Sequence, residues 1–350
     1  MAATTPTESA ILFAQAALSA TPVIILGSGA SAAHGVPGMD RLGKHLASLS
    51  VPAAWSTGEL DEWNGFLANL AKGDDLETAL GAVRPSPRQN QFVAEATRAF
   101  LFPSDRQALV GLISDRRHLP LSRLYKHLFT STHKTLNVVT PNYDRLAEYA
   151  ADAVEFAVFT GFNHGHLQLR AREADTRLMP NGQQVRTVKV WKVHGSLDWF
   201  QDADGGIIAL PQMEHTPAGF TPLMITPGLE KYRLAHGEPF RTIFTCSDTA
   251  LESARSYLCV GYGFNDEHLQ TKLVERCNTD SVPLVVVTRD LTDTAKAFLK
   301  GGKCRKYLAI EAAGSGSRFY THEHPDGFDV PHLEAWRLSA FLDMTIGVQA

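Results

Sequence analysis

The chain has 350 residues, of which 44% are hydrophobic and 20% charged, so it can build a large core and lacks the composition of a disordered protein. Its 33 basic and 37 acidic residues are interspersed and give a formal net charge of -4, which argues against a surface for nucleic-acid phosphates. A chain of this length fits one large α/β unit that carries an insertion.

Cysteine spacing and hydropathy argue against zinc-ribbon, disulfide-rich, secreted and membrane proteins. The four cysteines stand singly, without a CxxC pair, so neither a zinc ribbon nor a disulfide framework is predicted. The N-terminus lacks a basic region and a signal-peptide core, and no segment approaches the roughly 20 apolar residues of a membrane helix. We therefore expect a cytoplasmic protein that binds no zinc.

The first predicted elements are a helix at about residues 7–19 and a buried strand at 22–26, a short apolar run between Pro and Gly. From about residue 58 to 133 the pattern is helical, and strand signals are missing. The helices expected there are at 59–71, 76–83, 91–102, 106–114 and 121–129.

Strand signals return after residue 133 and alternate with helical stretches, at 136–140, 188–193, 223–226, 257–260 and 284–287. This alternation predicts an α/β fold with a Rossmann-like, doubly wound, mainly parallel sheet that carries a helical insertion. The expected units are a Rossmann-like domain (1–57 and 134–312), the helical insertion (58–133), and a C-terminal loop and helix (313–350). Residues 314–317 are expected in that exposed loop and the final helix near 331–342.

A run of small residues, Gly27-Ser28-Gly29-Ala30-Ser31, directly follows the first strand. Such a run lets the backbone turn tightly and offers N–H groups and a helix N-terminus to a pyrophosphate, although glycines after a strand also serve a turn alone. Ala32 stands where the usual dinucleotide fingerprint has its third glycine, and no acidic residue ends a second strand. An ordinary dehydrogenase is therefore disfavoured.

Polar residues follow three further strands: Asn142 and Asp144 in one loop, His194 in the next, and Asp266 in a loop that begins at Gly261. Each has an ordinary structural explanation, because Asn and Asp are common in turns and helix caps and a single histidine is often structural. Ligands of parallel α/β sheets bind at the carboxyl ends of the strands. The joint position of these residues therefore favours a shared site.

The ordered set of these motifs resembles the SIR2 family, in the spacing of its bacterial, non-sirtuin branch, over about residues 20–290. The resemblance implies that NAD⁺ is bound as a substrate, that Asn142 and Asp144 lie beside the nicotinamide ribose, and that His194 is a general base. It assigns the NAD⁺ phosphates, the nicotinamide end and the adenosine half to two glycine-containing loops and one strand end: Gly27, Ser28, Gly29, Ala30, Ser31, Gly261, Tyr262, Gly263 and Thr288.

Two departures separate the chain from the sirtuin deacylases of that family. Their four-cysteine zinc ribbon has no counterpart here, and their Asp-Phe-Arg triplet is replaced by Pro-Gly-Met-Asp-Arg at 37–41. The resemblance therefore implies an NAD⁺ glycohydrolase that releases nicotinamide and ADP-ribose, as the effector of a bacterial anti-phage defence system. Such effectors work as homo-oligomers or with a separately encoded partner, such as a HerA-type ATPase or an Argonaute-like protein.

Two other functions stay open at this point. One is a regulatory module that binds NAD⁺ or ADP-ribose without turnover, and the other is an NAD-dependent protein deacylase or ADP-ribosyltransferase. The helical insertion has no evident chemistry of its own. Two roles are equally open for it: to cover the pocket or make subunit contacts, or to complete the core.

Overall fold

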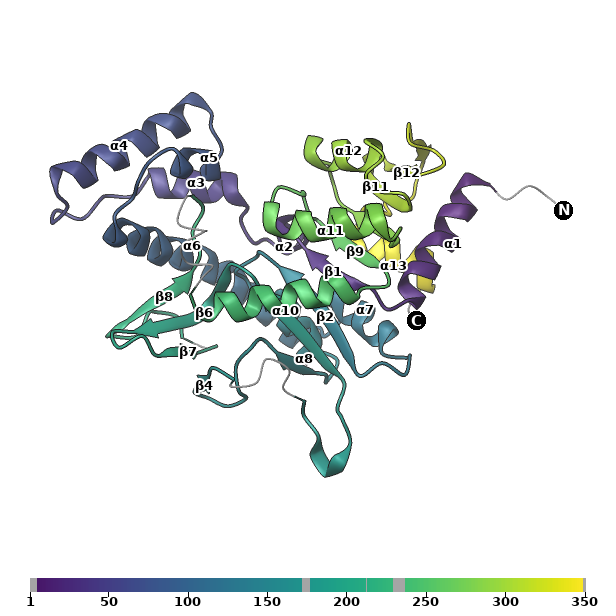
Figure 1. Cartoon of the computed structure of the whole chain (residues 1–350), viewed down its shortest axis with the longest axis horizontal. Coiled ribbons are helices and arrows are strands. Elements are labelled where there is room, and N and C mark those ends of the chain that lie inside the picture. Colours follow the sequence, from purple (N-terminus) through teal and green to yellow (C-terminus); the bar gives the residue numbers. More distant parts are fainter. Residues whose placement is uncertain (1–4, 172–176, 212, 229–236, 349–350) are drawn as a thin grey trace.

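A nine-stranded, mostly parallel sheet forms the centre of a mixed α/β fold (Figure 1). This computed structural model describes residues 5–171, 177–211, 213–228 and 237–348. The strands of the sheet are β1 (Val23–Leu26), β2 (Thr135–Thr140), β3 (Ala157–Phe159), β5 (Thr187–Lys192), β9 (Tyr257–Val260), β10 (Leu284–Val287), β11 (Tyr307–Ala313), β12 (Gly316–Thr321) and β13 (Phe328–Val330). The predicted fold class is confirmed.

The strand order is β13-β12-β11-β10-β9-β1-β2-β5-β3, and every pair from β11 to β3 is parallel. The chain therefore runs from β1 to β2 on one side and later returns to place β9 on the other side of β1. Between β1 and β9 the direction of winding reverses, and a crevice opens there at the carboxyl ends of the strands. This is the position at which doubly wound sheets bind ligands.

Helices cover both faces because the central strands are apolar on both. In β1, Ile24 and Leu26 pack on one face with the helices α1 and α7, whereas Val23 and Ile25 pack on the other. The helices are α1 (Pro6–Ser19), α2 (Ser28–Ala32), α3 (Met39–Ala47), α4 (Thr57–Lys72), α5 (Leu76–Gly81), α6 (Pro87–Ser114), α7 (Pro120–Leu128), α8 (Leu146–Asp152), α10 (Phe240–Ser253), α11 (Glu267–Thr279), α12 (Asp293–Lys300) and α13 (Leu338–Ile346), with a 3₁₀ turn at Pro180–Gly182.

The helical segment between β1 and β2 divides into two parts that pack differently. Helices α3, α4 and α5 and the first part of α6 enclose a separate small core around Trp63 and Phe66, and they project from the sheet (Figure 1). The second part of α6 and α7 instead join the main core through Leu112 and Leu124. This half of the expected insertion thus completes the core of the sheet domain.

Two predicted helices, at 91–102 and 106–114, form one continuous helix, α6, with Pro103 in its interior. Proline removes one helix hydrogen bond and favours a kink, which is why the sequence suggested a break. Buried contacts on both sides of Pro103 hold the helix together. On one side, the Arg98 guanidinium donates to the backbone oxygens of Leu197 and Glu214, each at 2.8 Å.

Three of the elements predicted from the sequence are wrong in their sheet, their type or their bounds. The strand expected at 223–226 is β8 (Phe220–Met224), which lies in a second, antiparallel sheet with β6 (Gly195–Asp202), β7 (Ile207–Ala209) and β4 (Gln168–Leu169). The loop expected at 314–317 is the hairpin between β11 and β12, in which only 314–315 form the turn. The final helix begins at Leu338, later than expected.

The buried carboxylate of Asp105 ties α6 to the loop that follows β2. Its oxygens accept hydrogen bonds from the Arg145 backbone N–H at 2.7 Å, from Arg145 Nε at 3.1 Å and from the Tyr149 hydroxyl at 2.7 Å. Asp105 is fully buried, and the Arg145 side chain is 5% exposed. The segment between Asn142 and α8 is thereby fixed from its carboxyl end.

We predict that Asp105→Ala lowers the free energy of unfolding by about 3–5 kcal/mol, because it leaves the Arg145 cation buried without its partner. Urea unfolding of the purified variant measures the change. The matched control is Asp40→Ala, which removes an exposed ion pair with Lys44 and is expected to change stability very little. Equal stability of the two variants would contradict the anchoring role of Asp105.

Candidate functional site

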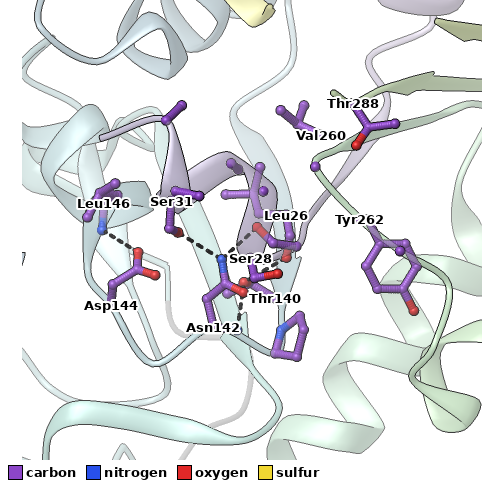
Figure 2. Close-up of a pocket in the computed structure, with 18 of the residues that line it drawn as sticks. Leu26, Ser28, Ser31, Thr140, Asn142, Asp144, Leu146, Val260, Tyr262 and Thr288 are labelled. Atoms are coloured by element: carbon purple, nitrogen blue, oxygen red, sulfur yellow. Dashed lines mark hydrogen bonds between the residues drawn. The ribbon is translucent and has the colours of Figure 1, made fainter. Parts of the chain in front are cut away.

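A cavity of about 870 Å³ lies at the carboxyl ends of the strands, where the winding of the sheet reverses. Its walls are the loops that follow β1, β2, β5, β9 and β10, together with residues from α2, α5, α7 and the start of α13. Figure 2 shows Ser31, Asn142 and Asp144 on one side and Tyr262 and Thr288 on the other. The volume is within the range of pockets for organic ligands.

Two backbone loops, after β1 and after β9, touch each other at the floor of this cavity. A side-chain Cβ at Gly27 would lie 2.3 Å from the Gly261 oxygen, and one at Gly29 would lie 2.8 Å from the Gly261 Cα. Gly261 itself has a φ of +57°, and its Cβ would lie 2.2 Å from the Ala30 nitrogen. All three positions therefore require glycine, because the contact is between backbones.

The contact between the loops after β1 and β9 uses two of the N–H groups that were predicted to bind a pyrophosphate. The Gly27 N–H donates to the Val260 oxygen and the Gly29 N–H donates to the Gly261 oxygen, both at 3.0 Å. The Ala30 N–H donates back to the Gly27 oxygen. These glycines therefore shape the cavity through close packing rather than by presenting their own N–H groups.

Asn142 is held against the glycine turn by its amide. Its Nδ2 donates to the Gly27 oxygen and to the Ser31 hydroxyl, both at 2.9 Å, and its backbone N–H donates to the Thr140 hydroxyl at 3.1 Å (Figure 2). Both amide protons are thus used within the protein. Among the described residues none donates to Asn142 Oδ1, so this oxygen is the acceptor that Asn142 offers to a ligand.

Asp144 lies beside Ser31 in the cavity wall and is 7% exposed. Burial raises the pKa of the Asp144 carboxyl above its usual range, and the charge of Lys192 and the Ser31 hydroxyl oppose that rise. One carboxylate oxygen accepts from the Leu146 N–H at 3.3 Å, so Asp144 also supports the start of α8. Asp144 therefore lines the cavity and also supports the start of α8.

Lys192 is a fully buried cation behind the Asp144 loop. Its Nζ donates to the Asp144 backbone oxygen and lies 3.1 Å from Glu148 Oε1. Burial raises the pKa of the Glu148 carboxyl to about 7, while the Lys192 charge opposes this. Lys192, paired with Glu148, fixes the loop that carries Asp144. The sequence alone gives no sign of this role for either residue.

His194 follows β5 and lies in the cavity wall, with 8% of its surface exposed. Its Nε2 is 3.0 Å from Asp266 Oδ2, and both side chains are nearly buried. Asp266 also caps α11, since its other oxygen accepts from the Leu269 N–H at 3.3 Å. From the sequence, Asp266 was predicted as a strand-end residue of a shared site or as a helix cap, and its contact with His194 was not predicted.

The opposite end of the cavity is formed by Tyr262, Gly263 and Thr288, three residues that the sequence predicted as NAD⁺ contacts. Tyr262 is buried and its ring packs 4.9 Å from that of Phe264. The helical segment between β1 and β2 also lines the cavity, through Glu77 of α5 and residues 119–121 at the start of α7. It therefore lines part of the cavity in addition to completing the core.

Three of the four cysteines, predicted to be isolated, lie together in the core under α11. Cys259, Cys277 and Cys304 are buried, and a hydrogen bond between Cys277 and Cys304, together with burial, raises the pKa of the Cys277 thiol. The described residues contain no group of three or more His, Cys, Asp or Glu side chains suited to hold a metal ion. None of the described helices is long and apolar enough to cross a membrane.

We predict that Gly261→Ala unfolds the protein at a much lower urea concentration than Gly314→Ala. Both glycines have nearly the same positive φ, +57° and +54°, but a Cβ at Gly314 meets no atom within 4 Å. Gly314→Ala should therefore cost only the backbone strain, about 1–3 kcal/mol, whereas Gly261→Ala also forces the two loops apart. Equal losses in the two variants would show that contact between the loops is not required.

Comparison with known proteins gives one family match and two structural likenesses. Residues 136–300 match the family model described as a SIR2-like domain. No curated protein matches the sequence. The matched range begins in β2 and ends with α12, so it contains Asn142, Asp144, His194 and Asp266 but leaves the turn after β1 outside.

The first solved structure is described as the structural basis for the mechanism and regulation of Sir2 enzymes; identity is 14% and the TM-score 0.35, over 82% of this chain and 88% of that one. The second is a mutant Sir2 homologue in complex with 2'-O-acetyl ADP-ribose, with 13% identity and a TM-score of 0.35, over 81% and 86% of the chains. Residues 136–300 are thus similar to a SIR2-like domain.

Proposed function

We propose that the protein is an NAD⁺ glycohydrolase, which cleaves NAD⁺ to nicotinamide and ADP-ribose. The observation that carries the proposal is the convergence of Asn142, Asp144 and His194, from two different strand ends, on one cavity. The cavity crosses the point at which the winding of the sheet reverses, so it offers separate walls to the two halves of a dinucleotide.

The two ends of the cavity suit the two halves of NAD⁺ differently. The wall after β2 and β5 carries an amide, a carboxyl and an imidazole, which are groups for proton transfer and for orienting water. The wall after β9 and β10 carries Tyr262, Gly263 and Thr288, of which only Tyr262 is titratable, and burial raises the pKa of its phenol well above the usual range. We therefore assign the nicotinamide ribose to the first wall and the adenosine half to the second.

Hydrolysis breaks the bond between the ribose C1' and the nicotinamide nitrogen. The pyridinium is a cationic leaving group, so it departs with the bonding electrons as neutral nicotinamide while positive charge develops on the ribose. The Asn142 oxygen accepts a hydrogen bond from the attacking water, which fixes the water at the open face of C1'. His194 accepts the proton that this water loses when it bonds to C1'.

Asp144 contributes to the same chemistry by its place beside Ser31. Burial of its carboxyl removes water from the wall that faces the ribose, and electrostatic effects are stronger where water is excluded. In its ionised form it stabilises the developing positive charge. We propose no role for zinc, because the reaction described here requires only a positioned water and an acceptor for its proton.

We predict that Asn142→Ala and His194→Ala each lower kcat for nicotinamide release by about 10²–10⁴-fold, as expected when a positioned acid-base group is lost. Chromatography of the products measures the rate, and calorimetry measures the Kd for NAD⁺. His127→Ala is the matched control, since His127 lies on α7 outside the cavity wall and should keep the wild-type rate.

The alternatives give different results in the same experiment. Tight NAD⁺ binding by the wild-type protein without nicotinamide release would replace the glycohydrolase by a binding module. Release that requires an acyl-lysine peptide would indicate a deacylase, and transfer of label to a protein would indicate an ADP-ribosyltransferase. Wild-type turnover in either folded variant would remove that residue from the mechanism.

We also propose that assembly controls this activity, as in an anti-phage effector that is held inactive until it is needed. Support comes from the resemblance to such effectors and from the helical segment between β1 and β2, which lines part of the cavity and projects beyond the sheet. Small rigid shifts of covering helices can gate a nucleotide site. A homo-oligomer or a partner such as a HerA-type ATPase or an Argonaute-like protein would favour the open arrangement.

We predict that turnover per active site is lower in the isolated monomer than in the assembled complex, at equal NAD⁺ concentration. Size-exclusion chromatography separates the two forms, and nicotinamide release is measured in each. Equal rates per site would exclude gating by assembly.

A further inference from the structure

Two contacts of Asp266 use different carboxylate oxygens. Oδ1 accepts from the Leu269 N–H at 3.3 Å and caps α11, while Oδ2 lies 3.0 Å from His194 Nε2. The Asp266 and His194 side chains are only 8% and 10% exposed. Because the cap fixes one oxygen, the direction of the other toward the imidazole is fixed as well.

The contact decides which imidazole nitrogen carries the proton. A nitrogen lone pair and a carboxylate oxygen repel each other at 3.0 Å, so the contact is favourable only when Nε2 carries a hydrogen. In the neutral ring Nδ1 is then the acceptor. Among the described residues none hydrogen-bonds to Nδ1, which leaves this nitrogen for a ligand.

We propose that Asp266 is a positioning residue for His194: it holds the imidazole in the Nε2–H tautomer and directs Nδ1 to the proton that the reaction releases. This inference rests on the proposed glycohydrolase. When Nδ1 takes the proton from the attacking water, the Asp266 carboxylate stabilises the imidazolium that forms. The proton is held on Nδ1, and Asp266 remains ionised throughout.

The geometry also explains how a small change would reverse this tautomer. In Asp266→Asn, the amide oxygen takes over the cap to Leu269, because only an oxygen can accept from that N–H. The amide NH₂ then occupies the position of Oδ2 and donates to Nε2, so the proton of the ring moves to Nδ1. The variant keeps its cap, because Asn is as good an N-cap residue as Asp.

The first test needs no NAD⁺. Imidazole ¹⁵N chemical shifts report which nitrogen carries the proton, and the spectrum of His194→Gln identifies the His194 signals. We expect a protonated Nε2 in the wild-type protein and a predominantly protonated Nδ1 in Asp266→Asn. An unchanged tautomer in this variant would overturn the proposal.

The second test is kinetic. Asp266→Asn and Asp266→Ser both keep a capping side chain, yet each is expected to lower kcat for nicotinamide release by about 10²-fold or more, with the Kd for NAD⁺ changed little. Asp75→Asn is the matched control, because Asp75 caps α5 by the same type of bond to the Thr78 N–H, at 2.9 Å. It should keep the wild-type kcat.

The two tests separate this inference from the function on which it rests. If the wild-type protein releases no nicotinamide, the proposed function fails, while the tautomer in Asp266→Asn still decides whether Asp266 orients His194. If the wild-type protein is active and both Asp266 variants keep its kcat, Asp266 is a helix cap and nothing more.

Discussion

The backbone contact between the loop after β1 and the loop after β9 is the constraint on which the rest of the site depends. Gly27 and Gly29 meet Gly261 so closely that no side chain fits at any of the three positions. The contact brings together two strands that are adjacent in the sheet but more than 230 residues apart in the sequence. Asn142 can reach both the Gly27 oxygen and Ser31 only because the turn is held in this place.

Buried charges hold the wall of the cavity that carries Asp144. Asp105 fixes Arg145, and Lys192 binds the Asp144 backbone oxygen, so the loop between β2 and α8 is held at two points. Removing such groups from water costs several kcal/mol, and partners of opposite charge and hydrogen bonds offset that cost. A purely apolar core would pack as well, but it would not fix the direction of the Asp144 backbone. We infer that these charges serve the geometry of the cavity.

The sequence predicted the elements that have a strong local signal. The strands β9 and β10 are continuous apolar runs, and their observed bounds agree with the prediction. The turn residues Gly27 and Gly29 and the strand-end residues Asn142 and His194 were predicted from the same signal, because they follow such runs, and they line the cavity. Their convergence follows from the parallel order of the strands.

What the sequence could not predict depends on contacts over long distances. β12 has few apolar residues and follows a short turn, so its pairing with β11 has no strong local pattern. Pro103 suggested a helix break that Arg98 and Asp105 overcome through buried contacts with other elements. The pairing of Asp266 with His194 joins residues 72 positions apart, and a helix cap explains Asp266 without it.

Helix α6 is one continuous helix that connects the projecting helices to the cavity wall. Its 28 residues, at about 1.5 Å per residue, span roughly 42 Å. One end lies in the small core of the projecting unit, and Asp105 beyond its middle holds the loop that carries Asp144. Pro103, where the helix bends most easily, lies directly before Asp105. A displacement of the projecting helices is therefore transmitted along α6 to the segment that lines the cavity.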